Sequence, residues 1–250
     1  MNTWEIIEKR ISCRAYEDRV PERAIYEELC RRAEEFNAAS GLHIQLFFSE
    51  TKGEPAIAMS PSMFTGPVYL YAALVGKDDD AGAEAVGYFG QKLVLFATEL
   101  GLGTCWVAST YDRSTVKAEV REGERLWDVV PMGYAPGKTP AKQKMIRAGI
   151  RAKDRPLRSF VQSPIPFEQL PEWVKKGAEA VRLGPSAVNG QPIDLVWDGE
   201  DLFIKIVKEN RGLQFNDLGI AKAQFEAAAE CCGVKGAFGP GDGALFVRTE

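Results

Sequence analysis

Residues 184–192 read Gly-Pro-Ser-Ala-Val-Asn-Gly-Gln-Pro, and residues 10–14 read Arg-Ile-Ser-Cys-Arg. The first stretch consists largely of residues that interrupt helices and strands, so it predicts a loop between a helix and a strand. The second stretch places two guanidinium groups and one hydroxyl at the end of a predicted helix. Because arginine is always charged and forms paired hydrogen bonds, this stretch could hold a phosphate group. Each stretch also has an ordinary interpretation, as a turn and as a solvated basic helix end.

The composition is that of a globular protein with a sizeable core. The 250 residues are 45% hydrophobic and 26% charged, and the formal net charge is −4. The acidic balance argues against nucleic acid and anionic membranes as partners. Five cysteines without a CxxC spacing argue against a disulfide framework or a metal site and favour a cytoplasmic location. The longest apolar run, residues 67–75, is too short to cross a bilayer.

The single histidine, His43, narrows the possible chemistry. It lies in an alternating run that predicts a strand, so we interpret it as a passive strand residue. Catalysis by a Ser-His-Asp triad and most histidine metal sites are thereby disfavoured.

Hydrophobic periodicity and breaker residues predict an alternation of helices and strands. The basic stretch 135–158 has little periodicity and is interpreted as a linker that runs over the surface. The predicted helices are 3–12, 22–36, 81–100, 115–121, 168–182 and 217–231, and the predicted strands are 43–49, 67–75, 126–134, 193–198, 202–208 and 244–248.

The chain also shows weak internal similarity, which predicts two tandem units, residues 1–160 and 161–250. Gly90-Gln-Lys-Leu-Val-Leu-Phe96 is similar to Gly219-Ile-Ala-Lys-Ala-Gln-Phe225. Chance similarity between two helices is the alternative explanation.

The sequence contains no complete copy of the common nucleotide-binding motifs. Residues 133–139, Gly-Tyr-Ala-Pro-Gly-Lys-Thr, are one residue short of a P-loop, and Pro140 follows where the helix would begin. No G-x-G-x-x-G stands between a predicted strand and a helix, which disfavours a Rossmann fold. The glycine-rich residues 239–243 precede a strand and predict a turn.

Taken together, several partial motifs resemble the flavin-dependent nitroreductase family. They are Arg-x-Ser-x-Arg followed by Tyr16, the Pro-Ser-x-x-Asn-x-Gln-Pro loop, Glu-Leu-Gly-Leu-Gly-Thr-Cys-Trp-Val at 99–107, Gly-Tyr-Ala-Pro at 133–136 and Lys-Asp-Arg-Pro-Leu at 153–157. The resemblance implies an α+β fold, an α/β/α sandwich with mixed, mainly antiparallel sheets.

One departure from the family pattern is informative. Family members are usually homodimers that bind FMN at the subunit interface, and the Pro-Ser-x-x-Asn loop follows soon after Arg-x-Ser-x-Arg. Here residues 36–45 have lost that loop, whereas the second unit has the loop at 184–192 and lacks the arginine motif. The sequence therefore resembles two fused subunits, a pseudo-dimer with one flavin site per chain. We expect a monomer or a weak homo-oligomer.

The resemblance also implies roles for particular residues. It implies that Arg10 and Ser12 contact the flavin phosphate, with Lys153 and Arg155 closing over it, and that Arg14 lies near the N1/C2 edge. Pro185, Ser186 and Asn189 would form a wall beside the ring system, and the backbone amides of Val107, Ala108 and Ser109 would lie near N5. No side chain is assigned a catalytic role, because the flavin carries the chemistry.

The implied function is an FMN-dependent oxidoreductase. NADH or NADPH would deliver hydride through flavin N5 to a nitroaromatic, a quinone or a similar small-molecule acceptor. Two alternatives stay open on the sequence alone: a non-catalytic protein that stores or senses FMN, and a structural protein that has kept the fold without flavin.

Overall fold

The computed structural model describes residues 1–152 and 154–249, which form two compact units built from separated stretches of chain. The N-terminal unit comprises Lys9–Asp78 and Lys92–Ala148. The C-terminal unit comprises Met1–Glu8, Asp79–Gln91 and the chain from Gly149 onward. The helix α3 (Asp80–Glu99) therefore contributes its first part to the C-terminal unit and its last turns to the N-terminal unit.

The N-terminal unit contains a four-stranded antiparallel sheet in the order β1-β2-β4-β3. Its strands are β1 (Gln45–Phe48), β2 (Leu70–Lys77), β3 (Gly103–Thr104) and β4 (Glu124–Gly133). In β2 every residue but the last is buried, as its uninterrupted apolar sequence predicts for a central strand. The helix α2 (Arg23–Ser40) precedes β1 and is capped at its C-terminus by Gly41, whose φ of 71° suits glycine.

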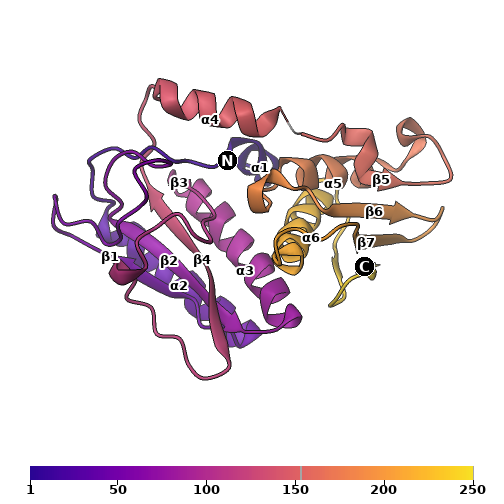
Figure 1. The fold of residues 1–250 in the computed structure, drawn as a ribbon. Helices are drawn as coiled ribbons and strands as arrows, with labels where there is room; N and C mark the ends of the chain where they lie inside the picture. Colours follow the sequence, from indigo (N-terminus) through magenta and orange to yellow (C-terminus); the bar gives the residue numbers. More distant parts are fainter. Residues whose placement is uncertain (153, 250) are drawn as a thin grey trace. The chain divides into compact units, whose positions relative to one another are not determined.

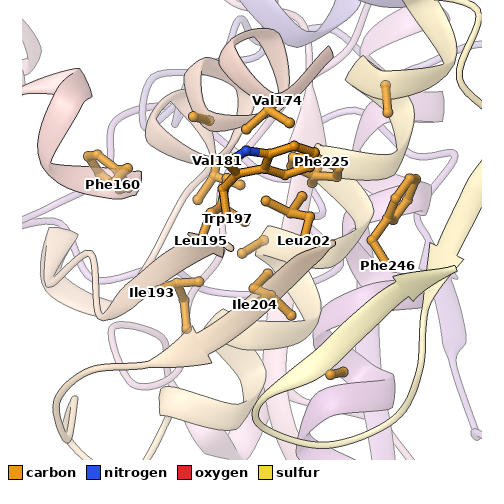
Figure 2. Packing of buried hydrophobic residues seen from close by; sticks show 14 of the residues in the cluster. Phe160, Val174, Val181, Ile193, Leu195, Trp197, Leu202, Ile204, Phe225 and Phe246 are labelled. Carbon is orange, nitrogen blue, oxygen red and sulfur yellow. The ribbon is translucent and has the colours of Figure 1, made fainter. Parts of the chain in front are cut away.

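The C-terminal unit contains a five-stranded sheet in the order β5-β6-β7-β9-β8, in which only the β5–β6 pair is parallel. The strands are β5 (Val161–Gln162), β6 (Ile193–Trp197), β7 (Leu202–Ile206), β8 (Gly236–Phe238) and β9 (Ala244–Arg248). The helices α1 (Thr3–Lys9), α5 (Glu172–Leu183) and α6 (Gln214–Cys231) also belong to this unit (Figure 1). Figure 2 shows the core between helices and sheet, where Val174, Trp197 and Phe225 meet.

The helix α6 is buried on all sides from Asn216 to Phe225. It crosses the first part of α3 at two glycines. A Cβ atom on Gly87 would lie 2.0 Å from the carbonyl oxygen of Asn216, and one on Gly219 would lie 2.0 Å from that of Glu84. The contact is reciprocal, because each glycine touches the residue three positions before the other glycine.

Two series of elements run through the chain in the same order. The first series is α2-β1-β2-α3-β3-β4, and the second series is α5-β6-β7-α6-β8-β9. The strands of both series pair in the same way, since β1-β2-β4-β3 and β6-β7-β9-β8 are antiparallel throughout. The second series adds the parallel strand β5 at the edge of its sheet.

The structure confirms the predicted α+β class with mainly antiparallel sheets and corrects three local predictions. The first helix ends at Lys9 rather than at residue 12, because Ser12 already pairs with Thr104. Residues 115–121 do not form a helix. Instead, Asp112 caps one 3₁₀ turn at Arg113–Thr115.

The third correction concerns the predicted linker 135–158. It contains a helix, α4 (Ala141–Arg151), which is amphipathic and buries Gln143. None of the helices in the described residues has the length and apolarity needed to cross a bilayer.

Candidate functional site

The arginine motif lies in an extended segment that follows α1 and is fixed against β3. Ser12 forms a parallel bridge with Thr104, and the amide of Cys13 donates to the carbonyl of Thr104 at 2.7 Å. The buried hydroxyl of Tyr16 lies 2.9 Å from the carbonyl oxygen of Cys13 and 3.0 Å from that of Pro131. A side chain on Gly103 would collide with Cys13, so glycine is needed for this close approach. The segment is therefore rigidly placed.

The three polar side chains of the motif influence one buried thiol, that of Cys105. Burial raises the pKa of Cys105, while the charges of Arg14 and Arg10 and a hydrogen bond with Ser12 act in the opposite direction. Arg10 is 8% exposed and Arg14 is half-buried. Arg10, Ser12 and Arg14 thus all act on the same buried thiol, and the Asp128 carboxylate acts on it with the opposite sign to the two arginines.

The residues expected near flavin N5 follow Cys105 along the chain. Val107 exchanges both of its backbone hydrogen bonds with Val129, at 3.0 and 2.9 Å, so its amide already has a partner. Ala108 is half-buried and Ser109 is exposed. Of the three residues, these last two are therefore the better placed to offer an amide to a ligand.

The loop 184–192 has a strained backbone. Val188, Asn189 and Gln191 have φ values of 48°, 56° and 47°, in the left-handed region that non-glycine residues rarely adopt. Positive φ is least favourable for a β-branched residue such as Val188. Because its side chain is 61% exposed, burial of that side chain does not account for the conformation. Such strain persists only where surrounding contacts enforce it, and it is concentrated at functional sites.

Two buried side chains hold Ala187 in this loop. The amide of Ala187 donates to Asp217 Oδ1 at 2.8 Å, and Asn210 Nδ2 donates to the carbonyl of Ala187 at 2.9 Å and to Asp217 Oδ2 at 2.6 Å. A Cβ on Gly190 would lie 2.3 Å from Asn210 Oδ1, so the absent side chain makes room for the asparagine. Burial raises the pKa of Asp217 to about 6, against the effect of these hydrogen bonds.

The remaining polar groups of the loop are also engaged. Ser186 Oγ accepts from the amide of Gln191 at 3.0 Å. Asn189 Nδ2 donates to the carbonyl of Ile150, at the end of α4, and to Asp154 Oδ1, at 3.0 and 2.8 Å. Since both N–H groups of this amide are used, Asn189 can offer a ligand only its oxygen atom.

Arg155 forms hydrogen bonds with Gln191 in the same loop. Its amide and Nη1 donate to the side chain and the carbonyl of Gln191, at 2.8 and 2.9 Å, and its Nη2 donates to Asp194 at 2.6 Å. To bind a phosphate, Arg155 would have to give up at least one of these partners. Lys153, its predicted companion, lies outside the described residues.

Sequence reasoning did not identify Asn210 and Asp217. One signal was available, because Asp217 stands inside a helix whose neighbouring residues are apolar or small. A carboxylate on a fully buried helix needs a partner.

Comparison with known proteins gives one family. Residues 2–229 match the family described as "Putative TM nitroreductase". Among solved structures, a "putative nitroreductase" from Thermotoga maritima is 22% identical, with a TM-score of 0.64 over 99% of this chain and 93% of that one. An FMN-dependent nitroreductase from Clostridium difficile is 18% identical over 54% of this chain and 89% of that one, with a TM-score of 0.42. A search of curated proteins gave no match.

Proposed function

Because the chain belongs to the nitroreductase family whose pattern covers residues 2–229, we propose that it is an FMN-dependent oxidoreductase. NADH or NADPH would be its reductant, and a nitroaromatic, a quinone or a similar small molecule its acceptor. Family membership over nearly the whole chain is the observation that carries this proposal. Bound FMN would supply hydride transfer at N5.

The residues present fit such a cofactor. Arg10, Ser12 and Arg14 would offer two guanidinium groups and a hydroxyl from five consecutive positions, which suits a phosphate and a second polar edge. The loop with Pro185, Ser186 and Asn189 would border the ring system from the second series. The buried anchors of that loop would keep its shape fixed before the ligand arrives, which lowers the entropy cost of binding.

The protein's own groups would bind, orient and shield rather than transfer protons. Arg14 would place a fixed positive charge beside the edge of the ring system that gains electron density on reduction. The amides of Ala108 and Ser109 would orient the reactive edge. The proposal requires no acid or base side chain.

We further propose one flavin per chain, because the two series differ where ligands would bind. The connection between helix and first strand has nine residues in the second series (184–192) and only four in the first (41–44). In the short connection, Asn37 binds both the amide and the carbonyl of Ile44, at 2.8 and 2.9 Å. On this proposal, the short connection of the first series does not contribute a flavin-binding loop.

The opposite difference is found between the last two strands. The first series has nineteen residues there (105–123), including those assigned to N5, whereas the second has five (239–243). Lys222 Nζ holds the short turn through the carbonyls of Gly239 and Gly241, both at 2.8 Å. Each series would thus keep one half of a single site, as expected for two fused copies of a subunit.

Flavin content is the test of this function. We expect purified protein, or protein incubated with FMN and gel-filtered, to retain one FMN per chain and to lose its visible absorbance with NADH or NADPH under anaerobic conditions. Arg10→Ala and Arg14→Ala should each weaken FMN binding at least about tenfold. Arg31→Ala, which removes an exposed arginine paired with Glu28, is the matched control and should leave FMN binding unchanged.

The outcomes separate the alternatives. A protein that binds FMN but is not bleached by either nicotinamide would be a storage or sensing protein. Absence of FMN binding would contradict the proposal, and two FMN per chain would contradict the single site.

A further inference from the structure

The unusual feature of loop 184–192 is that three left-handed residues without the freedom of glycine lie within four positions. Residues other than glycine seldom adopt this backbone conformation, so the isolated loop would adopt other conformations. Something outside the loop must therefore select this one.

The selecting contacts come from α6 and the segment before it. Asn210 is 6% exposed and Asp217 is 2% exposed, and together they bind both the N–H and the C=O of Ala187. Since Asn210 also donates to Asp217 at 2.6 Å, the three residues close a ring of hydrogen bonds. Ala187 is the residue directly before Val188, so the orientation of its peptide groups decides where the left-handed turn begins.

The same contacts determine which amides a ligand can reach. The amides of Ala187, Asn189, Gly190 and Gln191 donate to Asp217, Ser186, Ala187 and the Ser186 hydroxyl, respectively. Within the described residues, the amide of Val188 has no protein acceptor, and Val188 is the most exposed residue of the loop. A ligand acceptor can therefore meet this amide without displacing a protein contact.

We propose that Asn210 and Asp217 are positioning residues that hold Ala187 so that the loop presents the amide of Val188 to the ligand. The ligand class is a planar ring system with carbonyl or ring-nitrogen acceptors, so this inference rests on the proposed function. Neither residue touches the ligand, and both act through the backbone of Ala187.

The test combines ligand affinity with a measurement that needs no ligand. Asn210→Ala should weaken FMN binding at least about tenfold at a temperature where near-ultraviolet circular dichroism shows a folded protein. In the protein without FMN, the same substitution should accelerate hydrogen exchange at the amides of Asn189, Gly190 and Gln191 at least about tenfold. Asp217→Asn, and Gly190→Ala by displacing Asn210, should act in the same direction.

Asp198→Asn is the matched control. Asp198 Oδ1 accepts from the amides of Glu200 and Asp201, at 3.0 and 2.8 Å, in the turn at the other end of β6. The control substitution should change neither FMN affinity nor exchange in loop 184–192. If Asn210→Ala does not fold, Asp217→Asn carries the test.

A second background separates positioning from general stability. In Val188→Gly protein the left-handed conformation costs little, so Asn210→Ala should weaken FMN binding by a smaller factor than it does in the wild type. Equal FMN affinity of wild type and Asn210→Ala, or equal losses in both backgrounds, would overturn the positioning role. If wild-type protein binds no FMN, the proposed function fails. Unchanged hydrogen exchange of loop 184–192 in Asn210→Ala would separately overturn the positioning role of Asn210 and Asp217.

Discussion

The two series of the chain share their order of elements and their strand pairing, but they differ in their connections. Where the first series has a closed four-residue connection held by Asn37, the second has a strained nine-residue loop held by Asn210 and Asp217. Between the last two strands the lengths are reversed, and the short turn of the second series is held by Lys222. The comparison teaches that the two series share a framework and differ in their connections, and we assign two of the longer connections, 105–123 and 184–192, to the proposed site.

The largest effect is expected at the closed turn of the second series. Lys222→Met leaves the Glu84 carboxylate, which Lys222 contacts at 2.6 Å, buried without its partner. We expect a loss of about 3–5 kcal/mol in the free energy of unfolding, measured with urea. Adding Glu84→Gln should recover part of this loss. Lys175→Met, which removes an ion pair between a half-buried lysine and the exposed Glu172, should cost less than about 1 kcal/mol. If Lys222→Met reduced the free energy of unfolding no more than Lys175→Met, Lys222 would not be the residue that stabilises the short turn.

The second effect is a pH dependence of the free energy of unfolding that arises from Asp217, which holds loop 184–192. The pKa of Asp217 rises from 3.8 to about 6 on folding, so the folded protein holds a proton that the unfolded chain releases in this window. The contribution of Asp217 to the free energy of unfolding is largest below pH 4, and it falls by about 3 kcal/mol as the pH rises to 6. Urea unfolding of wild type and Asp217→Asn should show this as a difference that changes between pH 4 and 6. Parallel curves would contradict it.

The reciprocal crossing of α3 and α6 gives a third prediction. Gly87→Ala and Gly219→Ala each place a Cβ against a backbone carbonyl, and each should destabilise the protein by about 1–3 kcal/mol. A two-fold relation between the two series predicts similar losses at the two positions. Gly149→Ala in α4, which meets no atom within 4 Å, is the control and should be neutral or slightly stabilising. A large loss at one glycine with none at the other would argue against equivalence.

The smallest effect is expected at the closed connection of the first series. Asn37→Ala removes two hydrogen bonds to Ile44 and should cost about 1–2 kcal/mol in thermal or urea unfolding. FMN binding should not change, because this connection lies outside the proposed site. Weaker FMN binding in this variant would place the first series' connection in the site and break the comparison.

Much of the framework could be predicted because its signals are local. The apolar run at 67–75 predicts the buried strand β2, and the glycines after residue 100 predict the end of α3. The sequence did not predict the helix α4, because its apolar face is narrow and lies among lysines, arginines and Gly149. The sequence similarity paired Gly90 with Gly219, whereas the helix crossing pairs Gly87 with Gly219, three residues away.

The candidate site could be predicted only in part, because some of its determinants are distant in sequence. The arginine motif and loop 184–192 stand out as short patterns, and their roles remain predictions. The hydrogen bonds that join Ala187 to Asn210 and Asp217 span 23 and 30 residues, and neither partner belongs to a recognisable motif. The left-handed backbone of Val188 also runs against the preference of its residue type, so it follows from tertiary contacts rather than from local sequence.

The helix α4 has a consequence for the assembly of the proposed site. In a dimer of separate subunits, dilution separates the two halves of every interface site. Here the connection that contains α4 (Ala141–Arg151) makes the encounter of the two series intramolecular. On the proposed function, all residues assigned to the flavin therefore belong to one chain, and the amount of FMN bound per chain is expected not to change when the protein is diluted.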